Sequence, residues 1–221
     1  MARDYRRSDY DDYLKDDNIH INWYPGHMKK TKELVQNNLK LVDVVIELLD
    51  ARIPYSSKNP QIDEIVGNKP RVVVLNKSDL ANPANLSKWV NYYAKKGIKA
   101  IPVSTTRGNG VNKIIEECKN VTREMMENLK AKGRTERAIR VMIVGVPNVG
   151  KSTLINKLTG RKSTQTGDKP GVTKSKQWVR LKGNLELLDT PGILWPKFED
   201  QEVALNLAFS RAIKDEILDI D

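Results

Sequence analysis

Apart from residues for a folded core, the sequence has little that would stabilise the protein or anchor it in a membrane. Its 221 residues include one cysteine, two histidines and two phenylalanines. A single cysteine excludes an internal disulfide, and Cys118 lies in a helical pattern with no histidine near it in sequence, which favours packing over nucleophilic chemistry. No apolar run is long enough to span a membrane, and residues 1–5 show no signal peptide. The sequence therefore predicts a cytoplasmic globular protein.

Acidic residues are in the minority. The chain has 38 Lys and Arg against 28 Asp and Glu, which gives a net charge of +10. This balance indicates a polyanionic partner, although many basic proteins bind no nucleic acid. Residues 1–18 mix Asp, Arg and Tyr without an apolar period, which predicts a polar extension that is disordered or loosely packed.

A glycine-rich loop is the most specific motif in the chain. Residues 145–152 fit the phosphate-binding pattern Gly-x-x-x-x-Gly-Lys-[Ser/Thr], and they lie between a β-branched run and a helical run, as the motif requires. The loop amides are predicted to surround phosphate oxygens, Lys151 to reach the terminal phosphates and Ser152 to bind magnesium. The predicted GTP-binding residues of this loop are Pro147, Asn148, Val149, Gly150, Lys151, Ser152 and Thr153.

A second motif indicates which base is bound. Residues 76–79 (Asn76, Lys77, Ser78 and Asp79) follow a strand-like run and fit the pattern Asn-Lys-x-Asp. Asp79 can accept hydrogen bonds from the N1 proton and the 2-amino group of guanine, whereas adenine offers neither donor, so GTP is favoured over ATP. Ser104 and Thr105 follow a further strand and are the predicted base loop, with Thr105 where GTPases usually carry Ala.

Two later motifs would complete a GTPase. Thr173, within Pro-Gly-Val-Thr, is the predicted switch residue that covers magnesium and the γ-phosphate, although a lone threonine is more often structural. Residues 189–192 match the pattern Asp-x-x-Gly. Asp189 would organise magnesium through water, and the Gly192 amide would sense the γ-phosphate.

The order of these motifs is unusual. An ordinary GTPase begins with the glycine loop, whereas here the guanine motif and base loop precede the glycine loop, the switch threonine and Asp-x-x-Gly. The order predicts an α/β fold with the doubly wound, mostly parallel six-stranded sheet of a P-loop GTPase, circularly permuted. Together with Trp-Tyr-Pro-Gly-His-Met at 23–28 and Asp-Ala-Arg-Ile-Pro at 50–54, it resembles the circularly permuted GTPases over about residues 19–221, in particular the ribosome biogenesis GTPase A family.

The resemblance implies an activity and partners. Members of that family assist assembly of the bacterial large ribosomal subunit, so we expect magnesium-dependent GTP hydrolysis and binding to a large-subunit precursor and its rRNA. Ile193 stands where many GTPases carry the glutamine that orients the attacking water. The resemblance gives that role to His27, although His27 could instead begin a helix or contact RNA. It also implies that Asn148 coordinates potassium.

The predicted organisation has three parts. Residues 1–18 form the extension, 19–212 the permuted GTPase domain, and 213–221 the start of a C-terminal region whose helical domain is absent. We expect a monomer. Alternatives are a GTP-regulated RNA-binding placeholder and a permuted GTPase of the small subunit, which usually carries an additional RNA-binding domain not visible here. Candidate phosphate contacts, each of which could equally belong to a solvated basic face, are Lys29, Lys30, Arg161, Lys162, Lys174 and Lys176.

Overall fold

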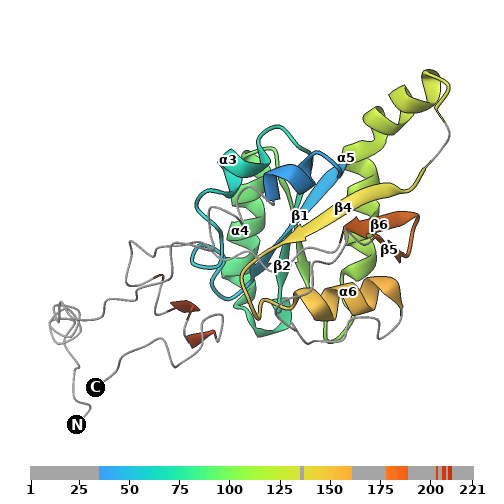
Figure 1. Ribbon diagram of the computed structural model, residues 1–221. Helices are drawn as coiled ribbons and strands as arrows, with labels where there is room; N and C mark the ends of the chain where they lie inside the picture. Colours follow the sequence, from blue (N-terminus) through green and yellow to red (C-terminus); the bar gives the residue numbers. More distant parts are fainter. Residues whose placement is uncertain are drawn as a thin grey trace, which may run out of the picture.

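The structure of the protein is a computed structural model. It describes residues 35–134, 137–160 and 178–188, together with Val203, Asn206, Leu207, Phe209 and Ser210. Within these residues a six-stranded sheet lies between two layers of helices (Figure 1).

The sheet is mostly parallel, as predicted. Its strand order is β3-β2-β1-β4-β6-β5, and only the pairing of β5 with β6 is antiparallel. All seven residues of β1 are buried, as expected for an apolar strand covered by helices on both faces. The strand bounds are Val44–Asp50 (β1), Arg71–Asn76 (β2), Lys99–Val103 (β3), Ile139–Val144 (β4), Trp178–Leu181 (β5) and Leu185–Leu188 (β6).

Helices cover both faces of the sheet. Alternate residues of β1 point to opposite faces, so that Ile46 and Leu48 pack in the core beneath α5 and α6. Val45 and Leu49 face the two smaller clusters under α3 and α4. The helix bounds are Ile62–Val66 (α3), Pro83–Lys95 (α4), Val111–Ala131 (α5) and Lys151–Thr159 (α6), with a 3-10 turn η1 at Ser78–Leu80.

The connection between α5 and β4 is where the permutation is visible. In the ordinary motif order the glycine-loop strand begins the domain, whereas here β4 continues from α5. Arg137, in the connection, donates from Nη1 and Nη2 to the two carboxylate oxygens of Asp43 at 2.6 and 2.8 Å. The Arg140 amide donates to the same carboxylate at 2.8 Å. Asp43, just before β1, therefore fixes where the connection enters β4.

Two buried groups are chemically distinctive. Cys118 is fully buried in α5, and burial raises the pKa of its thiol to about 12, in agreement with the predicted packing role. Glu47 on β1 is 2% exposed, and burial raises its pKa to about 7 despite Arg71, whose Nη1 lies 3.3 Å from Oε2. Among the described residues, no helix is both long enough and apolar enough to cross a membrane.

Candidate nucleotide site

Three loops lie at the carboxyl ends of parallel strands of the sheet. The guanine motif follows β2, the base loop follows β3, and the glycine loop joins β4 to α6. Open α/β sheets bind ligands at this edge. The structure thus brings together three motifs that are separated by up to about 75 residues in the sequence.

The glycine loop depends on close backbone packing. Gly150 has φ +105°, and a Cβ added there would lie 2.4 Å from Nδ2 of Asn76. A Cβ at Gly145 would lie 2.5 Å from the carbonyl oxygen of Leu48 on β1. Asn148 also adopts a positive φ, of 53°, which asparagine tolerates better than most residues. Both glycines of the pattern are therefore required by the packing as well as by phosphate access.

Lys151 spans this loop from the first turn of α6. Its ammonium group donates to the carbonyl oxygens of Gly145 and Val146 at 3.0 and 2.9 Å. Burial lowers the pKa of Lys151 to about 8. Ser152 and Thr153 follow it in the same turn, at the positive end of the helix dipole. This combination of cation and helix N-terminus suits a phosphate group.

Asn76 joins the loops to one another. Its side-chain Nδ2 donates to the carbonyl oxygen of Val149 at 2.7 Å, and its Oδ1 accepts from the Thr105 amide at 3.2 Å. The side chain is buried, so both bonds are shielded from water. The sequence predicts Asn76 only as a GTP-binding residue and gives no sign that it links the glycine loop to the base loop.

Lys77 is held in the left-handed region, with φ 60°. Its Nζ lies 2.9 Å from Oδ2 of Asp50, which also accepts two side-chain bonds from Arg52 at 2.9 and 2.6 Å. Burial alone would raise the pKa of Asp50, but the bonds from Arg52 and Lys77 outweigh it and hold the pKa below its usual value. The Asp-Ala-Arg-Ile-Pro motif thus anchors the guanine-motif lysine.

Asp79 lies on η1 beside the base loop. Its Oδ2 is 3.3 Å from Nε of Arg107, and its side chain is 15% exposed. Ser104 and Thr105 are almost fully buried, and the Ser104 hydroxyl lies 3.3 Å from that of Thr106. The Asp79 carboxylate is therefore paired with Arg107 and slightly exposed, beside the base loop. The sequence analysis does not single out Arg107 as a partner of Asp79. Its position, three residues after Ser104 of the base loop, could have indicated that it lies near the site.

Comparison with known proteins agrees with these motifs. A family described as 50S ribosome-binding GTPase matches residues 140–220. The ribosome biogenesis GTPase A of Priestia megaterium is 53% identical over 201 residues, which are 90% of this chain and 70% of that protein. The protein of the same name from Bacillus cereus is 54% identical over 200 residues, or 90% and 68% of the two chains. This chain belongs to the ribosome biogenesis GTPase A family.

A solved structure supports the same assignment. The crystal structure of GNP-bound YlqF from Thermotoga maritima superposes with a TM-score of 0.65 at 30% identity, covering 86% of this chain and 69% of that one. The GTPase described here therefore has the permuted P-loop sheet that its motif order predicted, and its enzymatic activity is GTP hydrolysis.

Several predicted site residues of this GTPase lie outside the described residues. They are the catalytic candidate, the switch and Asp-x-x-Gly residues and the candidate phosphate contacts, namely His27, Thr173, Asp189, Gly192, Lys29, Lys30, Arg161, Lys162, Lys174 and Lys176. Their roles remain predictions. Within the described part of the chain, no group of three or more His, Cys, Asp or Glu could hold a metal ion.

Proposed function

We propose that this GTPase binds a precursor of the large ribosomal subunit and hydrolyses GTP during late maturation of that subunit. The observation that carries the proposal is the nucleotide site, in which Asn76 joins the glycine loop to the base loop. The relatives of this chain are named ribosome biogenesis GTPase A. The net charge of +10 favours an RNA-rich partner. We place the protein in the cytoplasm as a monomer, with residues 19–212 as its GTPase domain.

The described residues would position the nucleotide. Lys151 and the first turn of α6 would hold the β- and γ-phosphates, while Asp79 would accept the N1 and 2-amino protons of guanine. Lys77 would support the base from its bond to Asp50. Thr105 would keep the base loop against Asn76. Each of these groups is already oriented by a contact within the protein, so little reordering would accompany binding.

The described residues supply one of the predicted magnesium ligands. The Ser152 hydroxyl stands directly after Lys151, and an oxygen ligand there suits a metal that otherwise binds phosphate oxygens and water. Thr173 and Asp189 would complete the set. When bound, magnesium would neutralise charge on the phosphates. We assign Asn148 to potassium, which would add positive charge beside the same phosphates.

His27 is our candidate for orienting the attacking water, because Ile193 cannot. In the permuted order the Trp-Tyr-Pro-Gly-His motif precedes β1, the strand that would ordinarily follow the helix after Asp-x-x-Gly. This order can bring His27 to the catalytic side of the sheet. The alternative role as an RNA-binding placeholder, in which hydrolysis serves only for release, would use the same residues. An experiment distinguishes the two roles.

Nucleotide-dependent co-sedimentation with large ribosomal subunits tests the proposal. We expect binding with a nonhydrolysable GTP analogue, weak binding with GDP, and faster GTP turnover when subunits are added. Binding to small subunits instead, or binding that ignores the nucleotide, would overturn the proposal. Unchanged turnover on subunits together with analogue-dependent binding would favour the placeholder.

A base-specificity variant provides the control. Asp79→Asn exchanges the carboxylate for an amide that can donate to the 2-oxygen of xanthine. We expect the variant to bind subunits with a xanthosine triphosphate analogue and to ignore the guanosine one. If the preferred base of the nucleotide changes in this way, the nucleotide that controls subunit binding must bind beside Asp79.

A further inference from the structure

One stretch of the sequence carries basic residues without acidic ones. Residues 80–115 contain no Asp or Glu, although 28 of the 221 residues of the whole chain are acidic, about one in eight. The same stretch contains six basic residues, namely Lys88, Lys95, Lys96, Lys99, Arg107 and Lys113. Two of these have carboxylate partners elsewhere, because Arg107 lies beside Asp79 and Lys99 lies 3.9 Å from Glu117.

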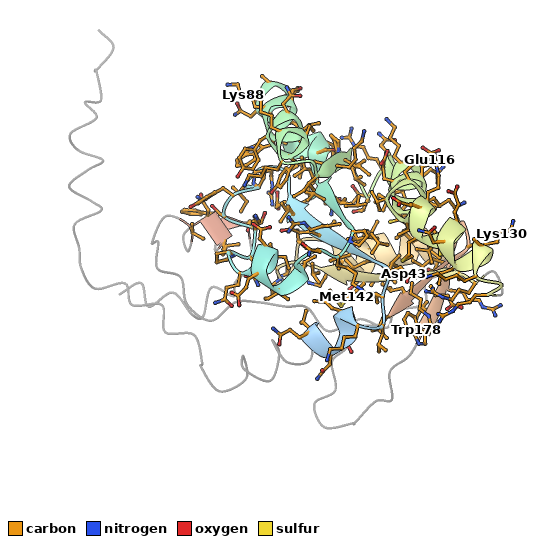
Figure 2. All side chains as sticks on the ribbon, turned by 90° about the horizontal axis from the view of Figure 1, so that it is seen from above. Asp43, Lys88, Glu116, Lys130, Met142 and Trp178 are labelled. Carbon is orange, nitrogen blue, oxygen red and sulfur yellow. The ribbon has the colours of Figure 1, made fainter. Side chains whose placement is uncertain are left out.

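Three of the four remaining cations of this stretch, Lys88, Lys95 and Lys96, lie on α4 or at its C-cap, and the fourth, Lys113, lies on α5. Lys88, Tyr92, Lys95 and Lys96 are spaced by three and four residues, so their side chains share one face of the helix. All four are exposed. Lys88 stands on the outer side of α4, away from the sheet (Figure 2). We call these four residues the α4 stripe.

Within the described part of the chain, no carboxylate forms an ion pair with a lysine of the α4 stripe, and the carboxylate that acts on Lys96, that of Asp63, does so at longer range. The residues one helical turn before its lysines are Ala84, Asn91 and Tyr92, none of which is acidic. Lys95 lies in the last turn of α4, where a cation stabilises the helix dipole. That explanation does not extend to Lys88, which lies in the middle of the helix. A surface evolved only for solubility would mix both signs of charge.

An aromatic cluster fixes the middle of the stripe. The ring of Tyr92 makes edge contacts with Trp89 and Tyr93, at centroid distances of 5.4 and 5.3 Å. Tyr93 is buried against the sheet, whereas Tyr92 is 42% exposed. The Lys96 ammonium lies 4.5 Å from the centre of the Tyr92 ring. The exposed ring is therefore held in place by its aromatic neighbours and lies beside a cation, an arrangement that suits a base stacked beside its phosphates.

We propose that the α4 stripe binds single-stranded RNA, with its three lysines on backbone phosphates and Tyr92 against a base. This inference rests on the proposed function, because it names a surface for the ribosomal partner. Cations on the same helix face as an exposed aromatic ring match the recurring unit of nucleic acid, whereas an acidic protein surface would not require the ring.

The position of α4 separates this surface from the nucleotide. The helix starts shortly after η1, at the carboxyl edge of the sheet, and leads to the beginning of β3 at the opposite edge (Figure 1). Its 13 residues span about 20 Å. Lys95 and Lys96 thus lie at the end of α4 remote from Asp79. RNA on the stripe would leave the nucleotide site open.

The test compares two triple variants with equal loss of charge. Lys88→Gln, Lys95→Gln and Lys96→Gln neutralise the stripe with a residue of similar helix propensity. The control is Lys119→Gln, Lys130→Gln and Lys132→Gln on and just after α5, where all three lysines are exposed and Glu116, Glu124 and Glu127 are interspersed. Lys130 lies well away from Lys88 (Figure 2). The probes are a large-subunit rRNA transcript and intact large subunits.

Binding measured across a salt series gives the readout. We expect the stripe variant to bind both probes at least tenfold more weakly near 0.1 M salt, with a slope of log K against log salt reduced by about 2, since each single-strand phosphate contact contributes about 0.7. The control should change much less, and both variants should bind GTP like the wild type. Tyr92→Leu should weaken binding without changing the salt slope.

Each other outcome is decisive. Equal effects of the two triple variants, or none, would overturn the stripe while leaving the proposed function intact, provided that the wild type binds. A loss confined to intact subunits, with naked rRNA bound normally, would mean a ribosomal protein partner and would also overturn the proposal. Failure of the wild type to bind either probe would count against the proposed function itself.

Discussion

The side chain of Asn76 donates to the carbonyl oxygen of Val149 at 2.7 Å. The guanine motif thus supports the glycine loop directly, although 73 residues separate the two positions in the chain. The close approach of Gly150 to the same amide leaves no room for a Cβ. Base recognition and phosphate recognition are consequently coupled through one buried amide.

Replacing Asn76 with Ala should therefore impair both halves of the site. We expect a loss of about 1 to 3 kcal/mol in unfolding free energy, because the buried Val149 carbonyl and Thr105 amide lose their partner. GTP affinity should fall at least tenfold. Asn76→Asp keeps the acceptor for Thr105 but removes the donor to Val149, so it should also weaken GTP binding.

Asn82→Ala is the matched control for Asn76. Asn82 caps α4 by accepting bonds from the amides of Ala84 and Asn85. Loss of this cap should cost about 1 kcal/mol of stability without changing GTP affinity. Chemical denaturation and equilibrium nucleotide titration measure the two quantities. Normal GTP affinity in Asn76→Ala would show that the link is dispensable.

Nucleotide binding should take up protons in alkaline solution. The free site holds Lys151 with a pKa of about 8, lowered by burial. Bound phosphates favour the charged amine and would raise that pKa, so binding at pH 8 should take up about half a proton, and at pH 7 about 0.1. Affinity should decrease as the pH rises above 8. Calorimetry in buffers of different ionisation enthalpy measures the uptake.

Lys151→Arg isolates this effect, because a guanidinium stays charged throughout the range. Its affinity is expected to be lower but independent of pH between 7 and 9. Proton uptake of the same size in the arginine variant would assign the linkage to another group.

Glu47 should make the fold less stable at neutral pH than it would be with a neutral side chain. Its folded pKa of about 7 lies above the ordinary value of 4.5. The folded state therefore binds more protons between these values, and the contribution of Glu47 to stability falls as the pH rises through this window. Arg71, Lys58 and Asp63 are the charged groups that act on it.

Glu47→Gln should remove this dependence. The variant is expected to match the wild type near pH 4.5 and to exceed it by about 3 kcal/mol at pH 8, measured by denaturant unfolding at several pH values. Glu116→Gln, on the exposed face of α5, should change neither stability nor its pH dependence. If Glu47→Gln were the less stable protein at pH 8, the ionised pair with Arg71 would be favourable after all.

Replacement of His27 tests the catalytic assignment. His27→Ala should lower subunit-stimulated GTP turnover at least tenfold while leaving GTP affinity nearly intact, because a water-orienting residue acts on the chemical step. His20→Ala removes the other histidine of the chain and should have little effect. Equal losses of turnover and affinity in His27→Ala would indicate a structural role.

The sequence predicted the fold well because its signals are local. β-branched runs such as 71–75 specify strands through burial on both faces, and the glycine loop contains its own backbone requirements. The observed strand β2 extends one residue further, to Asn76, whose side chain is fixed by the loop above it.

The links between motifs could not be predicted in this way. The bonds from Asn76 to Val149 and from Lys77 to Asp50 join residues that the sequence gives no means of pairing. Similarly, the α4 stripe emerges only once a helix places Lys88, Tyr92 and Lys96 on one face. Spatial relations of this kind depend on the register of the sheet and the phase of each helix.

The burial of Cys118 has a practical consequence. Its thiol is 0% exposed in α5 and hardly ionises at neutral pH. Because the chain has no other cysteine, a thiol introduced on the outer face of α4 would be the single site open to a maleimide dye. The protein can thus carry one fluorophore at a chosen position with its native core intact, and arrival of a partner could be followed in real time.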